Sequence, residues 1–231
     1  RKFKGRVVFQ GNNVQDQNWE VAMFQDLSAT PATMPASKAA DAYGCFPGNI
    51  CMQSDATQAY TQADLLGDDT YIRIPREMWQ DWWHDLKMRD PVGKLTKALY
   101  GHPSAGAYWE SHCEEHLIAQ GFKPVPEWRS CYFHKGLKVF LVVYVDDFKL
   151  SGPVKAVDAA YKLLTGPSPG RDTIPLVLDP LEDSARYLGC DHEQGQATAT
   201  WHEDGVTAEN QPNRNCNVRT VTANMQNVFE D

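Results

Sequence analysis

The sequence predicts an α+β fold in which an antiparallel sheet carries helices packed on one face. The first observation is an apolar, β-rich run, Val139–Val143, which a short acidic turn separates from the alternating stretch Phe148–Leu150. Two such runs around a tight turn are typical of a β-hairpin. The second observation is helical spacing of apolar residues at 104–120 and at 153–165, the first closed by Gly121.

The other elements follow from the same periodicities. A short helix is expected over Ser37–Tyr43, with Gly44 as its stop. The segments that favour strands are 4–10, 49–55, 70–74, 130–134, 138–144, 174–178 and 185–190. The aromatic segment Asp81–Asp85 fits neither pattern, and after Gly195 the chain is polar and patternless, so we expect loose structure there.

The acidic turn is the strongest functional signal. It reads Tyr144-Val145-Asp146-Asp147. Adjacent carboxylates repel each other unless a cation lies between them, so the turn predicts a divalent metal. Further carboxylate ligands must come from elsewhere in the chain, and Asp55, which ends the apolar stretch 49–54, is the best candidate. That pairing is a prediction about tertiary structure.

Composition narrows the class of protein. The 231 residues include six Cys without a C-x-x-C pair, which favours reduced thiols and an intracellular protein, cytoplasmic or nuclear. No apolar run approaches the length of a membrane span and no secretory signal is visible, so no membrane is expected as a partner. Because the chain starts at Arg1 without Met, we expect a fragment.

The charge distribution bears on nucleic-acid binding. The net charge is −8, and residues 156–231 hold 5 Lys and Arg against 12 Asp and Glu. Nucleic acids prefer basic surfaces, so this balance predicts weak, salt-sensitive binding at most. A local basic track around the acidic turn is expected from Lys135, Lys138 and Lys149.

These motifs occur in an order that resembles a known family, the reverse transcriptase domain of copia-type long-terminal-repeat retrotransposons. The resemblance covers residues 1–191. It rests on Lys4–Gly11, Asp55–Tyr60, Tyr71–Pro75, Lys94–Gly101, Tyr108-Trp109, Gly121-Phe122, Cys131–Phe133, Tyr144–Asp147 and Arg186–Cys190. The segment Lys94–Gly101 nearly matches the string that is most diagnostic of that family.

The resemblance implies a polymerase palm-and-fingers fold with an incomplete thumb. Its parts would be a fingers-like segment at 1–48, a palm at 49–191 and a polar tail at 192–231. The implied activity is that of an RNA-directed DNA polymerase, in which a primer 3′-hydroxyl attacks the α-phosphate of a nucleotide. The implied partners are an RNA template, a DNA primer and deoxynucleoside triphosphates.

The resemblance also implies roles for single residues. Two Mg²⁺ ions, or Mn²⁺ in their place, would bind the catalytic carboxylates Asp55, Asp146 and Asp147 and the backbone carbonyl of Ala56. Nucleotide binding would involve Lys4, Arg6, Ala56, Tyr60 and Ser104, with Tyr60 excluding a 2′-hydroxyl. Contact with the primer would come from Tyr187, Leu188 and Gly189.

The sequence departs from the family after Gly101. Ser104 stands where the family has Gln, and Ala107 stands where it has Arg. Both substitutions shorten the side chain, and Ala107 also removes a charge that can contact phosphate. These positions place the handling of template and nucleotide in question.

Other functions remain open at this stage. His112, Glu115 and His116 satisfy the pattern H-x-x-E-H, which on a helix can bind zinc for a peptidase. A non-catalytic alternative is an inactive retroelement remnant that keeps the fold. A second is a surviving nucleic-acid-binding module.

Overall fold

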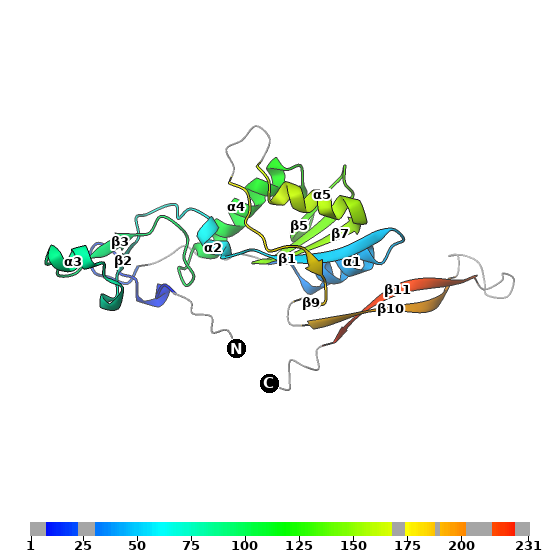
Figure 1. The fold of residues 1–231 in the computed structure, drawn as a ribbon, viewed down its shortest axis with the longest axis horizontal. Helices are drawn as coiled ribbons and strands as arrows, with labels where there is room; N and C mark the ends of the chain where they lie inside the picture. Colours follow the sequence, from blue (N-terminus) through cyan, green and yellow to red (C-terminus); the bar gives the residue numbers. More distant parts are fainter. Residues whose placement is uncertain (1–7, 23–30, 168–173, 188–189, 202–213, 225–231) are drawn as a thin grey trace. The chain divides into compact units, whose positions relative to one another are not determined.

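A computed structural model describes residues 8–22, 31–167, 174–187, 190–201 and 214–224 (Figure 1). The chain divides into two compact units: unit 1 is Arg1–Ala29 with Gln58–Glu115, and unit 2 is Thr30–Thr57 with His116–Asp231. This division differs from the segments predicted at 1–48, 49–191 and 192–231. It differs because the chain leaves unit 1 after residue 29 and returns to it at residue 58.

Unit 2 is built around a six-stranded antiparallel sheet in the order β4-β5-β6-β7-β1-β8. Its strands are β1 (Asn49–Asp55), β4 (Lys123–Val125), β5 (Trp128–His134), β6 (Val139–Tyr144), β7 (Asp147–Pro153) and β8 (Glu182–Asp183). The predicted strand 49–55 is confirmed, and so is the hairpin that joins β6 to β7. The predicted strand 174–178 is wrong, since this segment makes a single β-bridge, Ala56 with Leu178.

Two helices pack on this sheet. Helix α1 (Met34–Gly44) has small buried residues, Ala36 and Ala40, which let it approach β1, β6 and β7 closely. Helix α5 (Val154–Leu164) contacts the same three strands and buries Val157, Ala160 and Leu164 as its spacing predicted. The two helices lie on opposite sides of the sheet (Figure 1), whereas the sequence placed the helices on one face.

The sheet itself has two different faces. On β7 the side chains of Phe148 and Leu150 point to one face and are fully buried. Lys149 and Ser151 point to the other face, which α1 covers. The Lys149 ammonium and the Ser151 hydroxyl each donate a hydrogen bond to α1. Lys149 is therefore inside the protein, and its predicted place in a basic surface track is wrong.

A second sheet of three strands follows in the order β11-β10-β9. Its strands are β9 (Arg186–Tyr187), β10 (Cys190–Trp201) and β11 (Arg214–Asn224). The polar stretch after Gly195, expected to be loose, thus contributes to two long strands. Unbroken antiparallel pairing from Asp191 with Asn224 to Trp201 with Arg214 satisfies their backbone groups, which composition does not reveal.

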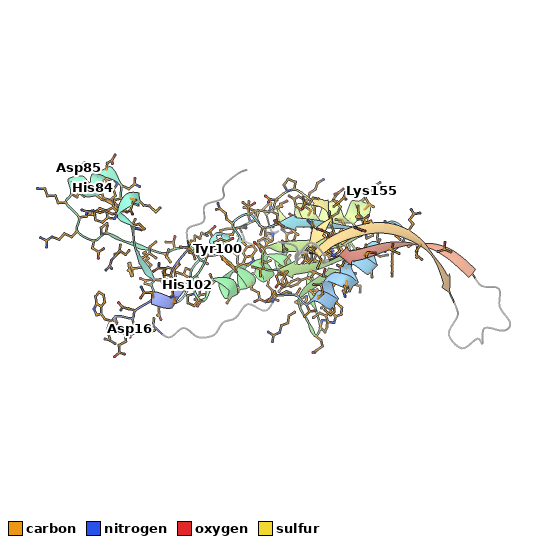
Figure 2. The ribbon with its side chains drawn as sticks, turned by 90° about the horizontal axis from the view of Figure 1, so that it is seen from below. Asp16, His84, Asp85, Tyr100, His102 and Lys155 are labelled. Carbon is orange, nitrogen blue, oxygen red and sulfur yellow. The ribbon has the colours of Figure 1, made fainter. Side chains whose placement is uncertain are left out.

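Unit 1 consists of short elements. They are η1 (Gly11–Asn13), α2 (Ala59–Gln62), β2 (Tyr71–Arg73), η2 (Arg76–Met78), α3 (Asp81–Asp85), β3 (Val92–Lys94) and the first part of α4 (Ala105–Ala119). The aromatic segment that no pattern placed forms α3, whose His84 and Asp85 are labelled in Figure 2. No helix in the described parts of the chain has the length and apolar character needed to cross a membrane.

The contact between α1 and β1 is tight enough to test by a single methyl group. A Cβ added at Gly44 would lie 2.6 Å from the Cβ of Cys51. We expect Gly44→Ala to lower the free energy of unfolding by about 1–3 kcal/mol, because overpacking forces backbone shifts. Urea unfolding followed by circular dichroism measures this change.

The matched control is Gly136→Ala, where the nearest atom to an added Cβ is 3.4 Å away. This variant is expected to stay within about 0.5 kcal/mol of the wild type. Equal stability of the two variants would contradict the close approach of α1 to β1.

Candidate functional site

Three predicted site residues meet at one end of the β1–β7 pair. Asp55, the last residue of β1, lies directly opposite Asp147, the first residue of β7. Partners in an antiparallel pair point to the same face, so both carboxyls project from the same side of the sheet. Asp55 is exposed and Asp147 is half-buried, which leaves this end of the pair open to solvent.

The turn that carries Asp146 is attached to the same strand end. The N–H of Ala56 donates a hydrogen bond to the carbonyl of Asp146, 2.7 Å away. Val145, in the turn, has φ +56°, a left-handed conformation that a β-branched residue rarely adopts and that costs on the order of 1–3 kcal/mol. Strain of this kind persists where the surrounding structure fixes the backbone, and here the Ala56 bond and the β6–β7 pairing do so.

The electrostatic environment of Asp147 includes the carboxyl of Asp55. Burial, then a hydrogen bond and charge from Asp55, then the charge of Asp146, raise the pKa of Asp147 to about 7. A protonated Asp147 can donate a hydrogen bond to a neighbouring carboxylate, which an ionised Asp147 cannot do. A cation at this place would substitute for that proton.

The donor set fits magnesium in its chemistry, because carboxylate and carbonyl oxygens are the ligands this ion prefers. The arrangement is not preformed. Among the described residues, no group of three or more His, Cys, Asp and Glu is gathered in a way that could hold a metal ion. Binding would therefore require Asp147 to lose its proton and separate from Asp55.

Asp179 is a further acidic residue at this site, and the sequence analysis did not single it out. Its N–H donates to the carbonyl of Asp55 at 2.8 Å, and its carboxylate accepts a hydrogen bond from the Thr57 hydroxyl at 3.0 Å. Asp179 thus lies on the other side of Asp55 from Asp147. The signal that identified Asp55, an apolar run ending in Asp, is also present at Ile174–Asp179 and could have found it.

Of the nucleotide-binding residues implied by the resemblance, Tyr60 and Ser104 belong to unit 1, whereas Ala56 belongs to unit 2. The Tyr60 ring, on α2, lies 4.6 Å from the Tyr100 ring, which is labelled in Figure 2. Ser104 is buried, and its N–H donates to Nδ1 of His102 at 3.2 Å. Lys4 and Arg6 lie outside the described residues.

Of the primer-contacting residues, only Tyr187 is described. Its side chain is 4% exposed and its ring packs over the ammonium of Lys149, 4.6 Å from the ring centroid. Leu188 and Gly189 lie outside the described residues. A primer contact at these positions stays a prediction of the resemblance.

The H-x-x-E-H segment gives no support to a zinc peptidase. His116 is 1% exposed, and burial lowers its pKa, while Glu115 is exposed. The three residues lie on helix α4, as their spacing predicted. In the described part of the chain, however, they do not belong to any group of three or more His, Cys, Asp and Glu that could hold a metal ion.

Comparison with known proteins gives one kind of relative. The Gag-Pol polyproteins of transposons Ty1-DR5, Ty1-LR2 and Ty1-ML2 of Saccharomyces cerevisiae are each 31% identical to this chain over 160 residues. The chain is homologous to part of a copia-type retrotransposon polyprotein. The match covers 67% of the chain, which spans only about 8% of the length of these relatives.

The retrotransposon part of the predicted resemblance is thereby confirmed, whereas the activity of the matched 8% of the polyprotein is a separate question. No family model matches the chain. No solved structure matches it either.

The raised pKa of Asp147 predicts a pH-dependent stability. The pKa is raised from 3.8 to about 7, so the folded state holds the proton more tightly than the unfolded state. In metal-free buffer the free energy of unfolding should therefore fall as pH rises from about 4 to 7 and stay low above that range. We expect Asp147→Asn to remove roughly 1–2 kcal/mol of this fall, after allowance for partial exposure.

Urea unfolding at pH 5 and pH 8 in the presence of a chelator provides the measurement. The exposed Asp158→Asn on α5 serves as the matched control and should keep the wild-type pH dependence. Parallel pH curves for wild type and Asp147→Asn would show that the pKa of Asp147 is not raised.

Proposed function

We propose that this chain is the reverse transcriptase domain of a copia-type retrotransposon polyprotein, an RNA-directed DNA polymerase with a palm-and-fingers fold. The observation that carries the proposal is the pairing of Asp55 with Asp147 beside the turn that holds Asp146. Asp55 and Asp147, 92 positions apart in the sequence, thus reach one strand end, as the resemblance requires. Homology to Ty1 Gag-Pol polyproteins supports the same origin.

In the proposed reaction the three carboxylates and the carbonyl of Ala56 would hold two magnesium ions. Bound magnesium supplies charge stabilisation at the attacking and leaving oxygens of a phosphoryl transfer. Asp55 is exposed to solvent, whereas Asp147 is half-buried and its pKa is raised to about 7, so a bound cation would favour the ionised form of Asp147. The hydrogen bond from the N–H of Ala56 holds the backbone of Asp146 at the end of β1.

The remaining roles in the proposal follow the resemblance. Lys4 and Arg6 hold the phosphates of the incoming nucleotide, and Tyr60, supported by the ring of Tyr100, blocks a 2′-hydroxyl. Ser104 presents a short side chain near the nucleotide. The segment 187–189 contacts the primer.

Primer extension tests the activity directly. With an RNA template, a DNA primer, deoxynucleotides and Mg²⁺, we expect extension by the wild type. Asp146→Asn should reduce it by about 100-fold or more, because the transition-state charge loses a metal ligand. Asp158→Asn, which changes an exposed carboxylate on α5, should extend normally.

The possible outcomes separate the alternatives. Binding of primer–template without extension would favour a nucleic-acid-binding module. Absence of both binding and extension would favour an inactive remnant of the retroelement. Extension that survives Asp146→Asn would contradict the assignment of the acidic turn.

A second experiment tests the role of Tyr60. Removing its ring opens space beside the sugar, so Tyr60→Ala should increase incorporation of ribonucleotides relative to deoxynucleotides about tenfold or more. Tyr60→Phe keeps the ring and should retain the wild-type preference. Single-nucleotide incorporation kinetics with matched ATP and dATP measure the ratio, and an equal ratio in all three proteins would contradict the role.

A further inference from the structure

Lys149 is an unusual residue for the centre of a sheet. It lies on β7, two residues from Asp147 and on the same face, and its side chain is 0% exposed. Removing an ammonium group from water carries a large desolvation penalty unless partners surround it. The position therefore requires an explanation that ordinary sheet packing does not give.

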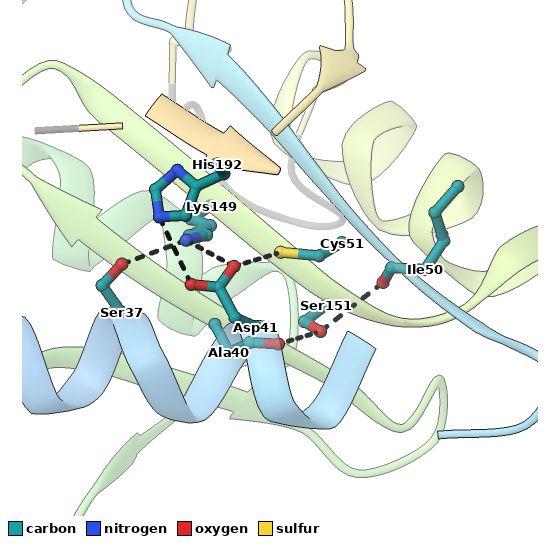
Figure 3. A network of polar contacts seen from close by, with 8 residues as sticks. All are labelled: Ser37, Ala40, Asp41, Ile50, Cys51, Lys149, Ser151 and His192. Carbon is teal, nitrogen blue, oxygen red and sulfur yellow. Dashed lines mark hydrogen bonds and ion pairs between the residues drawn. The ribbon is translucent and has the colours of Figure 1, made fainter. Parts of the chain in front are cut away.

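Helix α1 supplies two of its partners. The Lys149 ammonium lies 2.7 Å from Oδ1 of Asp41 and donates a hydrogen bond to the Ser37 hydroxyl at 3.0 Å (Figure 3). The Asp41 side chain is itself 11% exposed, so the ion pair is almost completely enclosed. The Ser151 hydroxyl, on the same face of β7, donates to the carbonyl of Ala40 and adds a second link to α1 (Figure 3).

The second sheet supplies the third partner. Tyr187 of β9 places its ring 4.6 Å from the Lys149 ammonium, within the range of a cation–π interaction. Nε2 of His192, on β10, lies 3.6 Å from Oδ2 of Asp41 (Figure 3). The Lys149–Asp41 pair, which joins β7 to α1, thus also contacts β9 and β10.

The hydroxyl of Tyr187 does not explain its position. Although it is buried, it has no hydrogen-bond partner among the described residues. A buried hydroxyl without a partner costs free energy, so the contact is held by the ring and not by the polar end. The cation beneath the ring is the feature that favours an aromatic residue here.

Stability alone is a weak reason for such a pair. Buried ion pairs often contribute no net stability compared with apolar residues of similar volume, although removing one partner is strongly destabilising. A buried charge that needs partners from several elements at the same time does, however, fix the relative placement of those elements. Lys149, Asp41 and Tyr187 bring β7, α1 and β9 together two residues along β7 from Asp147.

We propose that the Lys149–Asp41 pair is a positioning device that fixes β9, through the Tyr187 ring, against the catalytic strand β7. In this role the pair sets where Tyr187, the described residue among the proposed primer contacts, lies relative to Asp147. This consequence for the primer rests on the proposed polymerase function, whereas the placement of β9 does not. Lys149 and Asp41 are positioning residues and touch no substrate.

The decisive variant is the double substitution Lys149→Met with Asp41→Leu. It replaces the ion pair by apolar side chains, so the folded state should be as stable as the wild type or more stable. Positioning by the cation is nevertheless lost. Hydrogen exchange of the peptide that covers β9 should accelerate about five- to tenfold, while β1 and β7 exchange as in the wild type.

Kinetics give the second readout. The double variant should raise the KM for primer–template about five- to tenfold, with kcat and the KM for nucleotide within twofold of the wild type. Tyr187→Phe keeps the ring over the cation, so hydrogen exchange of the β9 peptide should stay at the wild-type rate. Lys155→Met, an exposed lysine on α5 labelled in Figure 2, is the matched control for loss of one positive charge.

The outcomes distinguish the two proposals. Unchanged β9 exchange in a stable double variant overturns the positioning role, whether or not the chain is a polymerase. Accelerated β9 exchange with no extension by the wild type supports the positioning role and removes the polymerase function. Accelerated exchange with an unchanged primer KM overturns the consequence for the primer.

Discussion

The antiparallel register between β1 and β7 is the constraint on which the acidic site depends. It runs without a bulge from Asn49 opposite Pro153 to Asp55 opposite Asp147. Because side chains alternate between the two faces, a slip of β7 by one residue would turn Asp147 to the other face of the sheet, away from Asp55. Buried Phe148 and Leu150 oppose such a slip, since it would bring them out of the core. Apolar packing on one face thus decides where the carboxylates meet on the other.

Two sets of charges occupy the face that α1 covers, and the structure handles them differently. Lys149 and Asp41 form a buried ion pair, and the Lys149 ammonium also contacts the Ser37 hydroxyl and the Tyr187 ring. Burial and the neighbouring Asp55 carboxyl raise the pKa of Asp147 to about 7, and Asp55 is open to solvent. One pair is closed and structural in character, whereas the other has unbalanced charge that a cation can relieve. This contrast, two residues apart along β7, is the main physical argument for a metal-dependent function.

Much of the local structure was predictable because its signals are local. The bounds of β1, the β6–β7 hairpin and the inner face of α5 follow from alternation, turn chemistry and helical spacing. Lys149 shows where this reasoning fails: as a polar residue in an alternating strand it was expected at the surface, but Asp41, 108 residues earlier, allows its burial. The strands β10 and β11 show a second failure, since their pairing satisfies the backbone of a stretch whose composition is polar. Both cases depend on partners that are distant in the sequence.

The sequence by itself determined the order of motifs, the acidic turn and the relation to retrotransposon polyproteins, because these are properties of residue identity and spacing. Only the tertiary structure decided that Asp55 faces Asp147, that Asp179 flanks them and that a buried cation lies two residues away. The physical reason is that carboxylates and ammonium groups act over a few ångströms. Which groups come that close is set by strand register and helix packing, and these in turn depend on the apolar core as a whole.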